Sequence, residues 1–487
     1  MNKPIRRVSI FCLVLILALM VRTNWVQGVQ AESWASNKNN KRNEYDRFAY
    51  PRGNIIVGGE RVTNSDFVDG LRYKYKRSWV DGPLYAPVTG YSSQVFKTSQ
   101  LESLEDGILS GTDDRLFFRN TLDMLTGEQK KGGDVVTTIN PKAQKAAFEG
   151  LGNKKGAAVA IDPRTGAILA LVSTPSYDPG TFAGAEKSDG EAKAKLDADP
   201  NKPMLNRALR ETYPPGSTFK LVTAAAAFEN NIFQSIDDPT DTPAPYILPG
   251  TRTELKNESS TEPCENATLR TALAVSCNTV YGKIGADLGK DKMREQAEKF
   301  GFNATVDTPI RSTASVYPKD STPDGTALDS IGQHDTKATP LQMAMVSAAI
   351  ANNGTLMQPY LVDEERSASL TTISKHTEKK LGQPISPATA QKLQDMMVSV
   401  VEDGQGTGHN ARIPGLKVGG KTGTAQHGED NNGLPFAWFT SWAKGDNGQS
   451  VAIAVVVEDG SNNRDGISGG RLAAPIAKAM MQAVLGK

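Results

Sequence analysis

The first marked feature of the chain is an apolar segment near its N-terminus. Residues 8–21 form an unbroken apolar-to-neutral run that follows a short basic stretch. A membrane span needs about 20 such residues, and Arg22 and Trp25 can extend the run because their side chains reach the interface. We therefore predict a cytoplasmic tail at 1–7 and a transmembrane anchor at 8–26, with the rest of the chain outside.

A cleavable signal peptide is the alternative interpretation of this segment. Val29-Gln30-Ala31 carries residues that are accepted before a cleavage site. Both interpretations place the following residues outside the cytoplasm, because the basic residues precede the apolar run. The polar stretch at 37–47, rich in Asn and basic residues, predicts a stalk above the membrane.

The remaining pattern predicts more than one domain. Residues 33–131 hold short strand-like runs with charged turns, typical of a pedestal or dimerisation-like domain. Residues 132–487 are enough for a substantial core, and they carry every catalytic candidate. No internal repeat is seen in the chain.

Within the larger part, strand patterns occur at both ends and helical patterns lie between. Ala437–Trp442 and the apolar run Val451–Val457 predict adjacent strands across a turn, and 473–484 predicts an apolar helix. Residues 158–170 predict two more strands, and 341–350 a buried helix. This order predicts an α+β fold, with one antiparallel sheet flanked by helices.

Three short polar motifs occur in this larger part in a fixed order. They are Ser217-Thr218-Phe219-Lys220, Ser276-Cys277-Asn278 and Lys421-Thr422-Gly423-Thr424. Pro and Gly precede Ser217 and an alanine-rich stretch follows, which predicts a loop entering a helix. On that helix Lys220 lies one turn from the Ser217 hydroxyl.

Second copies of two motifs are less suited to the chemistry. Ser441-Trp442-Ala443-Lys444 lies in a predicted strand before a turn, and on a strand Ser441 and Lys444 point to opposite faces. Ser461-Asn462-Asn463 repeats the S-x-N spacing. Order and context therefore favour the first copies.

The three motifs together predict a serine nucleophile that is activated without histidine. A serine attacks poorly unless a base takes its proton, and Lys220 can be that base only if its pKa falls. Lys421, if the fold places it nearby, supplies a second cation that lowers that pKa. Ser276 would then relay a proton to the leaving amine, and Asn278 would bind a substrate amide carbonyl.

The remaining positions are predicted to bind substrate. The backbone N–H of Ser217, at a helix start, and that of Thr424 are candidate oxyanion donors. The hydroxyls of Thr422 and Thr424 would hold a substrate carboxylate. Gly423 removes a side chain where a ligand approaches the backbone of a predicted strand.

Each motif also has an ordinary structural interpretation. An exposed S-x-x-K is commonly a solvated pair, S-x-N a helix cap, and K-T-G a turn. All three occurring in the required order and local structure favours the catalytic interpretation.

With these residues the chain resembles the penicillin-binding proteins of class B, the monofunctional transpeptidase type. Arg52-Gly53-Asn54-Ile55 is similar to the R-G-x-I motif of that class. Gly82–Tyr91 resembles the penicillin-binding protein A group of actinobacteria, and Asp134–Asn140 looks like the start of a transpeptidase domain. The resemblance covers nearly the whole chain beyond the apolar segment, and it implies that the anchor is retained.

The resemblance implies a peptidoglycan D,D-transpeptidase. Ser217 would attack the D-Ala-D-Ala bond of one stem peptide and pass the acyl group to an amine of another, and β-lactams would acylate the same serine. No metal or organic cofactor is implied. The implied partner is a membrane-embedded peptidoglycan glycosyltransferase.

Three alternatives share the motifs. A D,D-carboxypeptidase needs the same residues, as does a β-lactamase, although no E-x-x-x-N element that would hold a deacylating water lies between Asn278 and Lys421. A non-catalytic scaffold or sensor is a third, but only about seven residues precede the membrane segment, too few for a cytoplasmic output domain.

Other residues leave questions open. Cys264 and Cys277 either form a disulfide that braces the S-x-N wall or remain separate. Gly332-Gln333-His334 departs from a Gly-Gln-Gly-like turn, and its histidine is expected at the surface. Among the histidines only His427 is a candidate for the cleft rim.

The balanced net charge of +1, without a basic stripe, excludes nucleic-acid binding.

Overall fold

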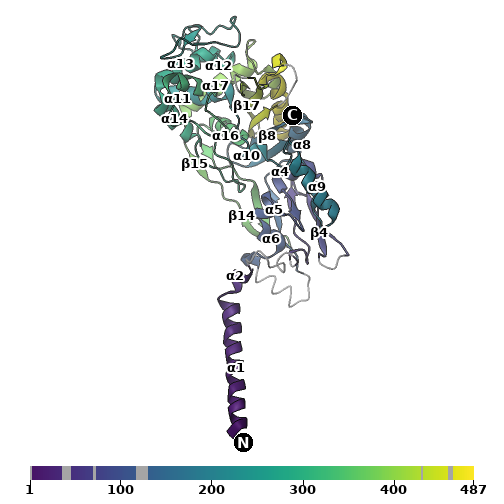
Figure 1. Ribbon diagram of the computed structural model, residues 1–487. Helices are drawn as coiled ribbons and strands as arrows, with labels where there is room; N and C mark the ends of the chain where they lie inside the picture. Colours follow the sequence, from purple (N-terminus) through teal and green to yellow (C-terminus); the bar gives the residue numbers. More distant parts are fainter. Residues whose placement is uncertain are drawn as a thin grey trace.

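The N-terminal helix stands apart from the rest of the chain (Figure 1). Helix α1, Lys3–Gly28, has no buried residue, and it is the one helix in the described part of the chain that is long and apolar enough to cross a membrane. It is longer than the predicted segment 8–26 at both ends, because its polar flanking residues also have helical geometry. The computed structural model describes residues 3–35, 45, 47–69, 73–116, 130–428, 432–458 and 464–487.

The smaller N-terminal part is built on a mixed sheet of five strands, in the order β14-β13-β7-β1-β2. Strands β1 (Ile55–Val57) and β7 (Asp134–Thr137) are parallel, and β13 (Val362–Arg366) pairs antiparallel to β7. Strands β13 and β14 (Thr372–Lys375) come from far along the chain, so distant segments complete this sheet. The other elements of this part are β2 Glu60–Arg61, β3 Thr63–Phe67, β4 Tyr75–Trp79, α4 Gly82–Thr89, β5 Ser92–Ser93, β6 Lys97–Thr98, α5 Gln100–Leu104 and α6 Asp106–Ser110.

A buried ion network lies beside this sheet. The guanidinium of Arg52, in the R-G-x-I motif, contacts Glu102 at 2.9 Å and Asp106 at 2.7 Å, and Arg77 contacts Glu102 at 2.6 Å. The side chains of Arg52, Arg77 and Glu102 are at most 2% exposed. This motif therefore has a structural role within the N-terminal part.

The larger part contains an antiparallel sheet of five strands, in the order β16-β17-β18-β8-β9. The strands are β8 (Gly156–Ile161), β9 (Ile168–Thr174), β16 (Lys417–Ala425), β17 (Phe436–Lys444) and β18 (Ser450–Val457). The predicted antiparallel α+β architecture is confirmed, and the strands predicted at 437–442 and 451–457 are found at Phe436–Lys444 and Ser450–Val457. Strand β16, which carries the third motif, lies at an edge of the sheet.

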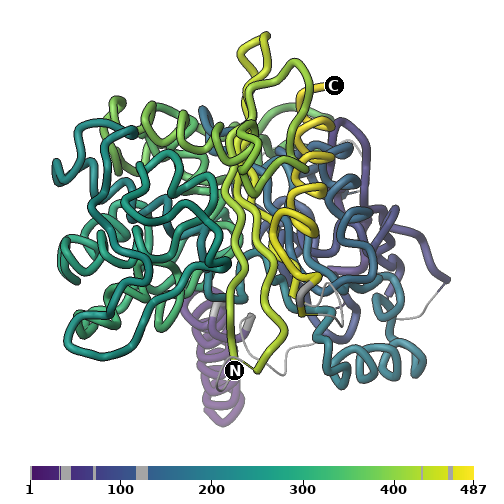
Figure 2. Tube along the Cα trace, turned by 90° about the horizontal axis from the view of Figure 1, so that it is seen from above, coloured from purple at the N-terminus to yellow at the C-terminus, as the bar shows by residue number. Residues whose placement is uncertain are grey.

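Both faces of this sheet are covered by helices because its residues alternate between two cores. Ala157, Val159 and Ile161 pack toward α16 (Pro340–Ala351), whereas Ala158 and Ala160 pack toward α19 (Ala474–Leu485). Figure 2 shows the yellow-green C-terminal strands between the teal and green helices and the yellow C-terminal helix.

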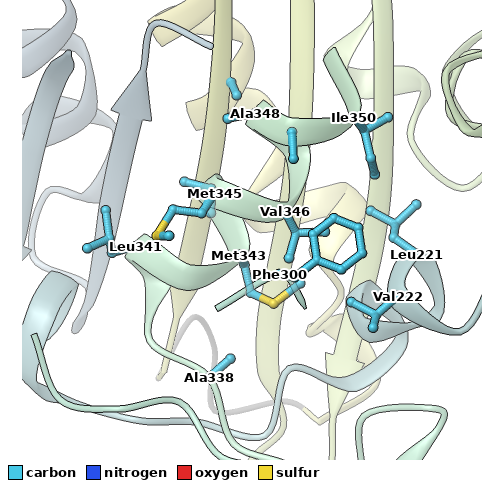
Figure 3. Packing of buried hydrophobic residues seen from close by; sticks show 14 of the residues in the cluster. Leu221, Val222, Phe300, Ala338, Leu341, Met343, Met345, Val346, Ala348 and Ile350 are labelled. Carbon is cyan, nitrogen blue, oxygen red and sulfur yellow. The ribbon is translucent and has the colours of Figure 1, made fainter. Parts of the chain in front are cut away.

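Helix α16 is the buried helix predicted at 341–350. All of its residues are buried, and Figure 3 shows Met343 beside Phe300 and Met345 beside Leu341 in the core. The remaining helices and strands of this part are α8 Pro141–Leu151, α9 Lys187–Ala198, α10 Arg207–Arg210, α11 Lys220–Glu229, β10 Tyr246–Ile247, β11 Glu254–Leu255, α12 Leu269–Ala274, α13 Asn278–Leu288, α14 Lys290–Lys299, α15 Pro323–Asp329, β12 Leu356–Met357, β15 Lys380–Gly382, α17 Pro387–Glu402 and α18 Gly469–Leu472.

Candidate active site

Ser217 lies where a loop turns into a helix, as predicted. The 3₁₀ turn Gly216–Phe219 precedes α11, so Lys220 begins the α-helix and is completely buried. Gly216 has a φ of 52°, which glycine adopts at no steric cost, and its N–H donates to the Gly332 carbonyl at 2.9 Å. Ser217 is 7% exposed, and its hydroxyl makes no hydrogen bond within the described part of the chain.

The K-T-G motif lies in β16, directly beside the Ser217 turn. A Cβ atom at Gly423 would lie 3.0 Å from the Pro215 carbonyl oxygen and 3.1 Å from Thr218 Cγ2. The missing side chain therefore makes room for the turn that carries Ser217, a reason that the sequence did not reveal. Gly423 also lines the cleft described below.

The S-x-N motif precedes α13, Asn278–Leu288. Ser276 has a left-handed φ of 68°, an uncommon conformation that surrounding contacts must hold. Asn257 Oδ1 supplies one such contact, because it accepts the N–H of Asn278 at 2.7 Å. Cys264 and Cys277 form a disulfide, which decides between the two possibilities left open by the sequence.

The two motif lysines meet at Ser276. Lys421 Nζ donates to Ser276 Oγ at 2.8 Å, and Lys220 Nζ lies 3.3 Å from the same oxygen. Lys220 Nζ also donates to the Ser276 carbonyl at 2.7 Å and to Asn278 Oδ1 at 2.8 Å. The structure thus brings Lys220, Ser276, Asn278 and Lys421 into one hydrogen-bonded group.

Burial lowers the pKa of both lysines. The pKa of Lys220 lies well below its ordinary value because of burial and then the positive charge of Lys421. The pKa of Lys421 is lowered to about 7 by burial, against the opposing effect of Glu258 and Glu262. A lysine whose ammonium is this poorly stabilised can lose its proton near neutral pH and act as a base.

A cleft of about 280 Å³ opens onto this group. Ser217, Ser276, Thr422, Gly423 and Thr424 line it, whereas the lysines lie behind its wall. Thr422 Oγ1 lies 2.6 Å from Thr407 Oγ1. The cleft residues that the sequence did not indicate are Glu258, Thr407, His409, Asn410, Ser468, Gly469, Gly470 and Arg471.

Some of these missed residues left a signal in the sequence and others left none. The pair Gly469-Gly470 is visible in the sequence as a signal of close backbone approach. The structure gives the reason, because a Cβ at Gly469 would lie 1.9 Å from the Trp438 carbonyl oxygen. Glu258 has no local signal, because it reaches the cleft through a long loop.

Of the histidines, His427 was only a candidate for the cleft rim, and the structure places another histidine there. His427 does not line the cleft, because its Nε2 contacts the Leu434 carbonyl at 2.6 Å and its ring stacks on Phe436. His409 lines the cleft instead. His334, whose side chain is 42% exposed, lies at the surface as expected, with Nδ1 3.2 Å from Asp329 Oδ1.

The second S-x-x-K copy does not join this group. Ser441 is buried within β17, where its Cα pairs with that of Gly420, and Lys444 Nζ donates to Gln394. Ser441 lies on a strand, as predicted. Ser461-Asn462-Asn463 lies outside the described residues. No cluster of three or more metal-ligating side chains occurs in the residues that the structure describes.

Comparison with known proteins identifies two matching families. Residues 156–482 match the penicillin binding protein transpeptidase domain, and residues 52–135 match the penicillin binding protein A dimerisation domain. The first match covers more than half of the chain.

Two mycobacterial relatives are similar over their whole length. The peptidoglycan D,D-transpeptidase PbpA of Mycolicibacterium smegmatis is 39% identical, with 100% of this chain and 99% of the relative covered. PbpA of Mycobacterium tuberculosis H37Rv gives the same identity and coverage.

Solved structures of penicillin-binding protein A from M. tuberculosis have the same fold. A ceftriaxone acyl-enzyme complex superposes with a TM-score of 0.85 and 38% identity, covering 91% of this chain and 100% of the other. A penicillin G acyl-enzyme complex gives a TM-score of 0.83 at 38% identity, covering 90% and 100%.

Proposed function

The chain belongs to the penicillin-binding protein transpeptidases, and from this premise we propose how its residues perform the reaction. It is a peptidoglycan D,D-transpeptidase and a target of β-lactams. The observation that carries the residue-level proposal is the pair of buried lysines that share the Ser276 hydroxyl beside Ser217.

Ser217 is the nucleophile. Its Oγ attacks the carbonyl carbon of the penultimate D-Ala, so that a C–O bond forms, the peptide C–N bond breaks and the terminal D-Ala leaves. A β-lactam reacts at the same oxygen by opening its ring. The hydroxyl has no competing hydrogen bond within the described residues, which supports its availability for attack.

Lys220 is the base that accepts the Ser217 proton. A neutral lysine has two N–H donors and one lone pair. The short contacts to the Ser276 carbonyl and Asn278 Oδ1, at 2.7 and 2.8 Å, use both donors. The lone pair is then left for a hydroxyl proton, and the lowered pKa of Lys220 favours this neutral form.

Ser276 and Lys421 return a proton to the leaving amine. The Ser276 oxygen accepts from Lys421 Nζ at 2.8 Å, so its own hydrogen is available for donation toward the cleft or toward Lys220. This arrangement supports a relay from Lys220 through Ser276 to the departing nitrogen. Asn278 is proposed to contact a substrate amide as well as to hold Lys220.

The edge strand binds the substrate. The N–H groups of Ser217 and Thr424 are the proposed oxyanion donors, since both residues line the same cleft. Thr422 and Thr424 are proposed to hold the terminal carboxylate, with Thr407 orienting the Thr422 hydroxyl from 2.6 Å. Gly423 lets the nucleophile turn approach this strand.

The anchor and the N-terminal part position the catalytic part. We assign 1–7 to the cytoplasm, 8–26 to a single membrane span, 33–131 to a pedestal and 132–487 to an extracellular transpeptidase domain. The apolar helix α1 supports this topology. The partner proposed to supply the glycan strands is a membrane-embedded peptidoglycan glycosyltransferase, which would lie near the foot of the pedestal.

Labelling with a fluorescent penicillin tests the nucleophile. The full-length protein in detergent is expected to take a long-lived covalent label. Ser217→Ala is expected to abolish that label, and the matched control Ser441→Ala, which removes a hydroxyl outside the cleft, is expected to keep it. Labelling of Ser217→Ala at the wild-type rate would contradict the assignment, and a rapidly lost label would favour a β-lactamase.

A further inference from the structure

Glu258 lies at the mouth of the cleft and has no partner of its own. Its side chain is exposed, and it makes no hydrogen bond or ion pair within the described part of the chain. It lines the catalytic cleft of about 280 Å³ with Ser217, and it also lines a neighbouring cavity of about 460 Å³. The two cavities therefore share one unpaired carboxylate.

The loop that carries Glu258 is fastened to the active-site wall. Asn257, the preceding residue, accepts the N–H of Asn278 at 2.7 Å and so caps the helix that follows the S-x-N motif. The disulfide between Cys264 and Cys277 joins the other end of the loop to the same motif. Glu258 is thus held beside the reacting group by contacts of its neighbours rather than by its own carboxylate.

The lining of the cleft holds one fixed cation and one carboxylate. Lys220 and Lys421 lie behind the wall, and His409 and Arg471 line the opening. Among the residues that line the cleft, Glu258 carries the one carboxylate. A cation that enters this cleft is attracted by Glu258 and repelled by Arg471.

The neighbouring cavity continues this negative charge away from Ser217. Glu254, Glu258 and Glu262 line it, and Lys256 lies 3.6 Å from Glu254. Burial raises the pKa of Glu262, and Glu258 adds to that effect. The cavity is therefore a polar trough with an excess of carboxylates.

The acceptor of the transpeptidation reaction is a cation when it enters the cleft. Its second substrate is an amine, and an alkyl amine with a pKa near about 10 is an ammonium at neutral pH. This amine must reach the ester carbonyl of acylated Ser217 although two buried lysines lie nearby.

We propose that Glu258 is the positioning residue for the acceptor, binding the ammonium of the second stem peptide while the chain that bears it lies in the neighbouring cavity. The inference rests on the proposed function, and it names the acceptor as a primary alkyl amine that arrives protonated.

The transfer step exchanges the C–O bond of acylated Ser217 for a C–N bond to the acceptor. The ammonium releases one proton to solvent as it leaves Glu258, and the neutral nitrogen attacks the acyl carbon. The C–N bond forms and the C–Oγ bond of Ser217 breaks. A second proton of the amine returns through Lys220 to Ser217 Oγ. Glu258 attracts and orients the amine but takes no proton, because a glutamate is a far weaker base than a lysine amine.

Competition between two acceptors tests this inference. The full-length protein is acylated by a thioester donor, and the acyl group is transferred either to Nα-acetyl-lysine methylamide, which is cationic, or to hydroxylamine, which is neutral near neutral pH. Both acceptors attack the same acyl-enzyme, so any change in acylation cancels in the ratio of their kcat/KM values.

Glu258→Gln is expected to lower that ratio by about fivefold, the size of a solvent-accessible ion pair, chiefly through the KM of the lysine derivative. Added salt is expected to raise this KM in the wild type and to leave it nearly unchanged in Glu258→Gln. Glu258→Asp is expected to restore part of the ratio. Glu265→Gln is the matched control, because it neutralises a carboxylate of the same loop outside both cavities.

An unchanged ratio in Glu258→Gln, or an equal change in Glu265→Gln, would overturn the inference while leaving the transpeptidase assignment intact. Failure of the wild type to form an acyl-enzyme at Ser217 would instead contradict the proposed mechanism.

Discussion

Two groups of buried basic side chains in this molecule differ in the partners that surround them. In the N-terminal part, Arg52 and Arg77 are buried against Glu102, which accepts from both guanidiniums. In the catalytic part, Lys220 and Lys421 are buried against a hydroxyl, an amide and carbonyl oxygens, and no carboxylate of the described residues contacts them.

The pKa values reflect this difference. Burial lowers the pKa of Arg52, but Glu102 and Asp106 outweigh it, so that this pKa lies above its ordinary value. Arg77 shares Glu102 with Arg52, and burial lowers its pKa below the ordinary value. Burial also lowers the pKa of Lys220 and Lys421, and the carboxylates of Glu258 and Glu262 offset this effect only in part. Burial with a matched counterion stabilises a charge, whereas burial without one makes a lysine ready to lose its proton.

The largest expected effect is on catalysis. Lys220→Met removes the proposed base, and we expect acylation by penicillin to slow by about 10²–10⁴-fold, as for other general bases. The unfolding free energy is expected to change by no more than about 2 kcal/mol, because the lost hydrogen bonds are offset by removal of a buried polar amine. Stopped-flow acylation and urea unfolding measure the two quantities, and wild-type acylation in this variant would contradict the comparison.

Glu102→Gln is expected to lower stability strongly and to leave the acylation rate nearly unchanged. It leaves two buried guanidiniums without their shared carboxylate, and we expect a loss of about 3–5 kcal/mol of stability in urea unfolding. The acylation rate of the protein that remains folded is expected to be close to that of the wild type.

Asp237→Asn is the control for this loss. Its partner Arg270 is 2.7 Å away, but both side chains are substantially exposed, so a loss below about 1 kcal/mol is expected. Equal losses in the two variants would show that burial does not distinguish the pairs.

Lys421→Met tests the comparison through the pH dependence of the unfolding free energy. The pKa of Lys421 is lowered to about 7 in the folded chain, whereas an unfolded lysine titrates near about 10.4. Between these values the unfolded chain binds a proton that the folded chain has lost. This contribution to stability is complete above the unfolded pKa and is lost as pH falls toward about 7, with a slope of about 1.4 kcal/mol per pH unit.

The variant is expected to have a smaller slope than the wild type in urea unfolding between about pH 7 and 10. Lys187→Met, at a side chain that is 92% exposed, is the control and is expected to keep the wild-type slope. An unchanged slope in Lys421→Met would argue against a lowered pKa.

The smallest expected effect concerns the neutral contacts that hold the catalytic group. Asn257→Ala removes the side-chain cap of α13 and is expected to cost about 1 kcal/mol in unfolding free energy. Acylation is expected to slow modestly, because Asn278 is held less firmly against Lys220. Asn447→Ala, in an exposed turn, is the matched control. An equal loss of unfolding free energy in that variant would contradict a stabilising role of the Asn257 cap.

The sequence by itself predicted those features that depend on residues close together in the chain. The alternation of the C-terminal strands, the glycine and alanine context of Ser217, and the apolar helix at 341–350 depend on neighbours in sequence, so their patterns predicted the elements. The order of the three motifs pointed to the catalytic residues because each motif carries its own local geometry.

The tertiary structure alone decided which distant residues meet. Strands β13 and β14 join the N-terminal sheet across more than two hundred intervening residues. Thr407, Glu258 and Arg471 reach the cleft from three separate loops or helix starts. The Cys264–Cys277 pairing and the shared contact of two lysines with Ser276 likewise depend on how separate elements pack, and composition and spacing do not encode such distances.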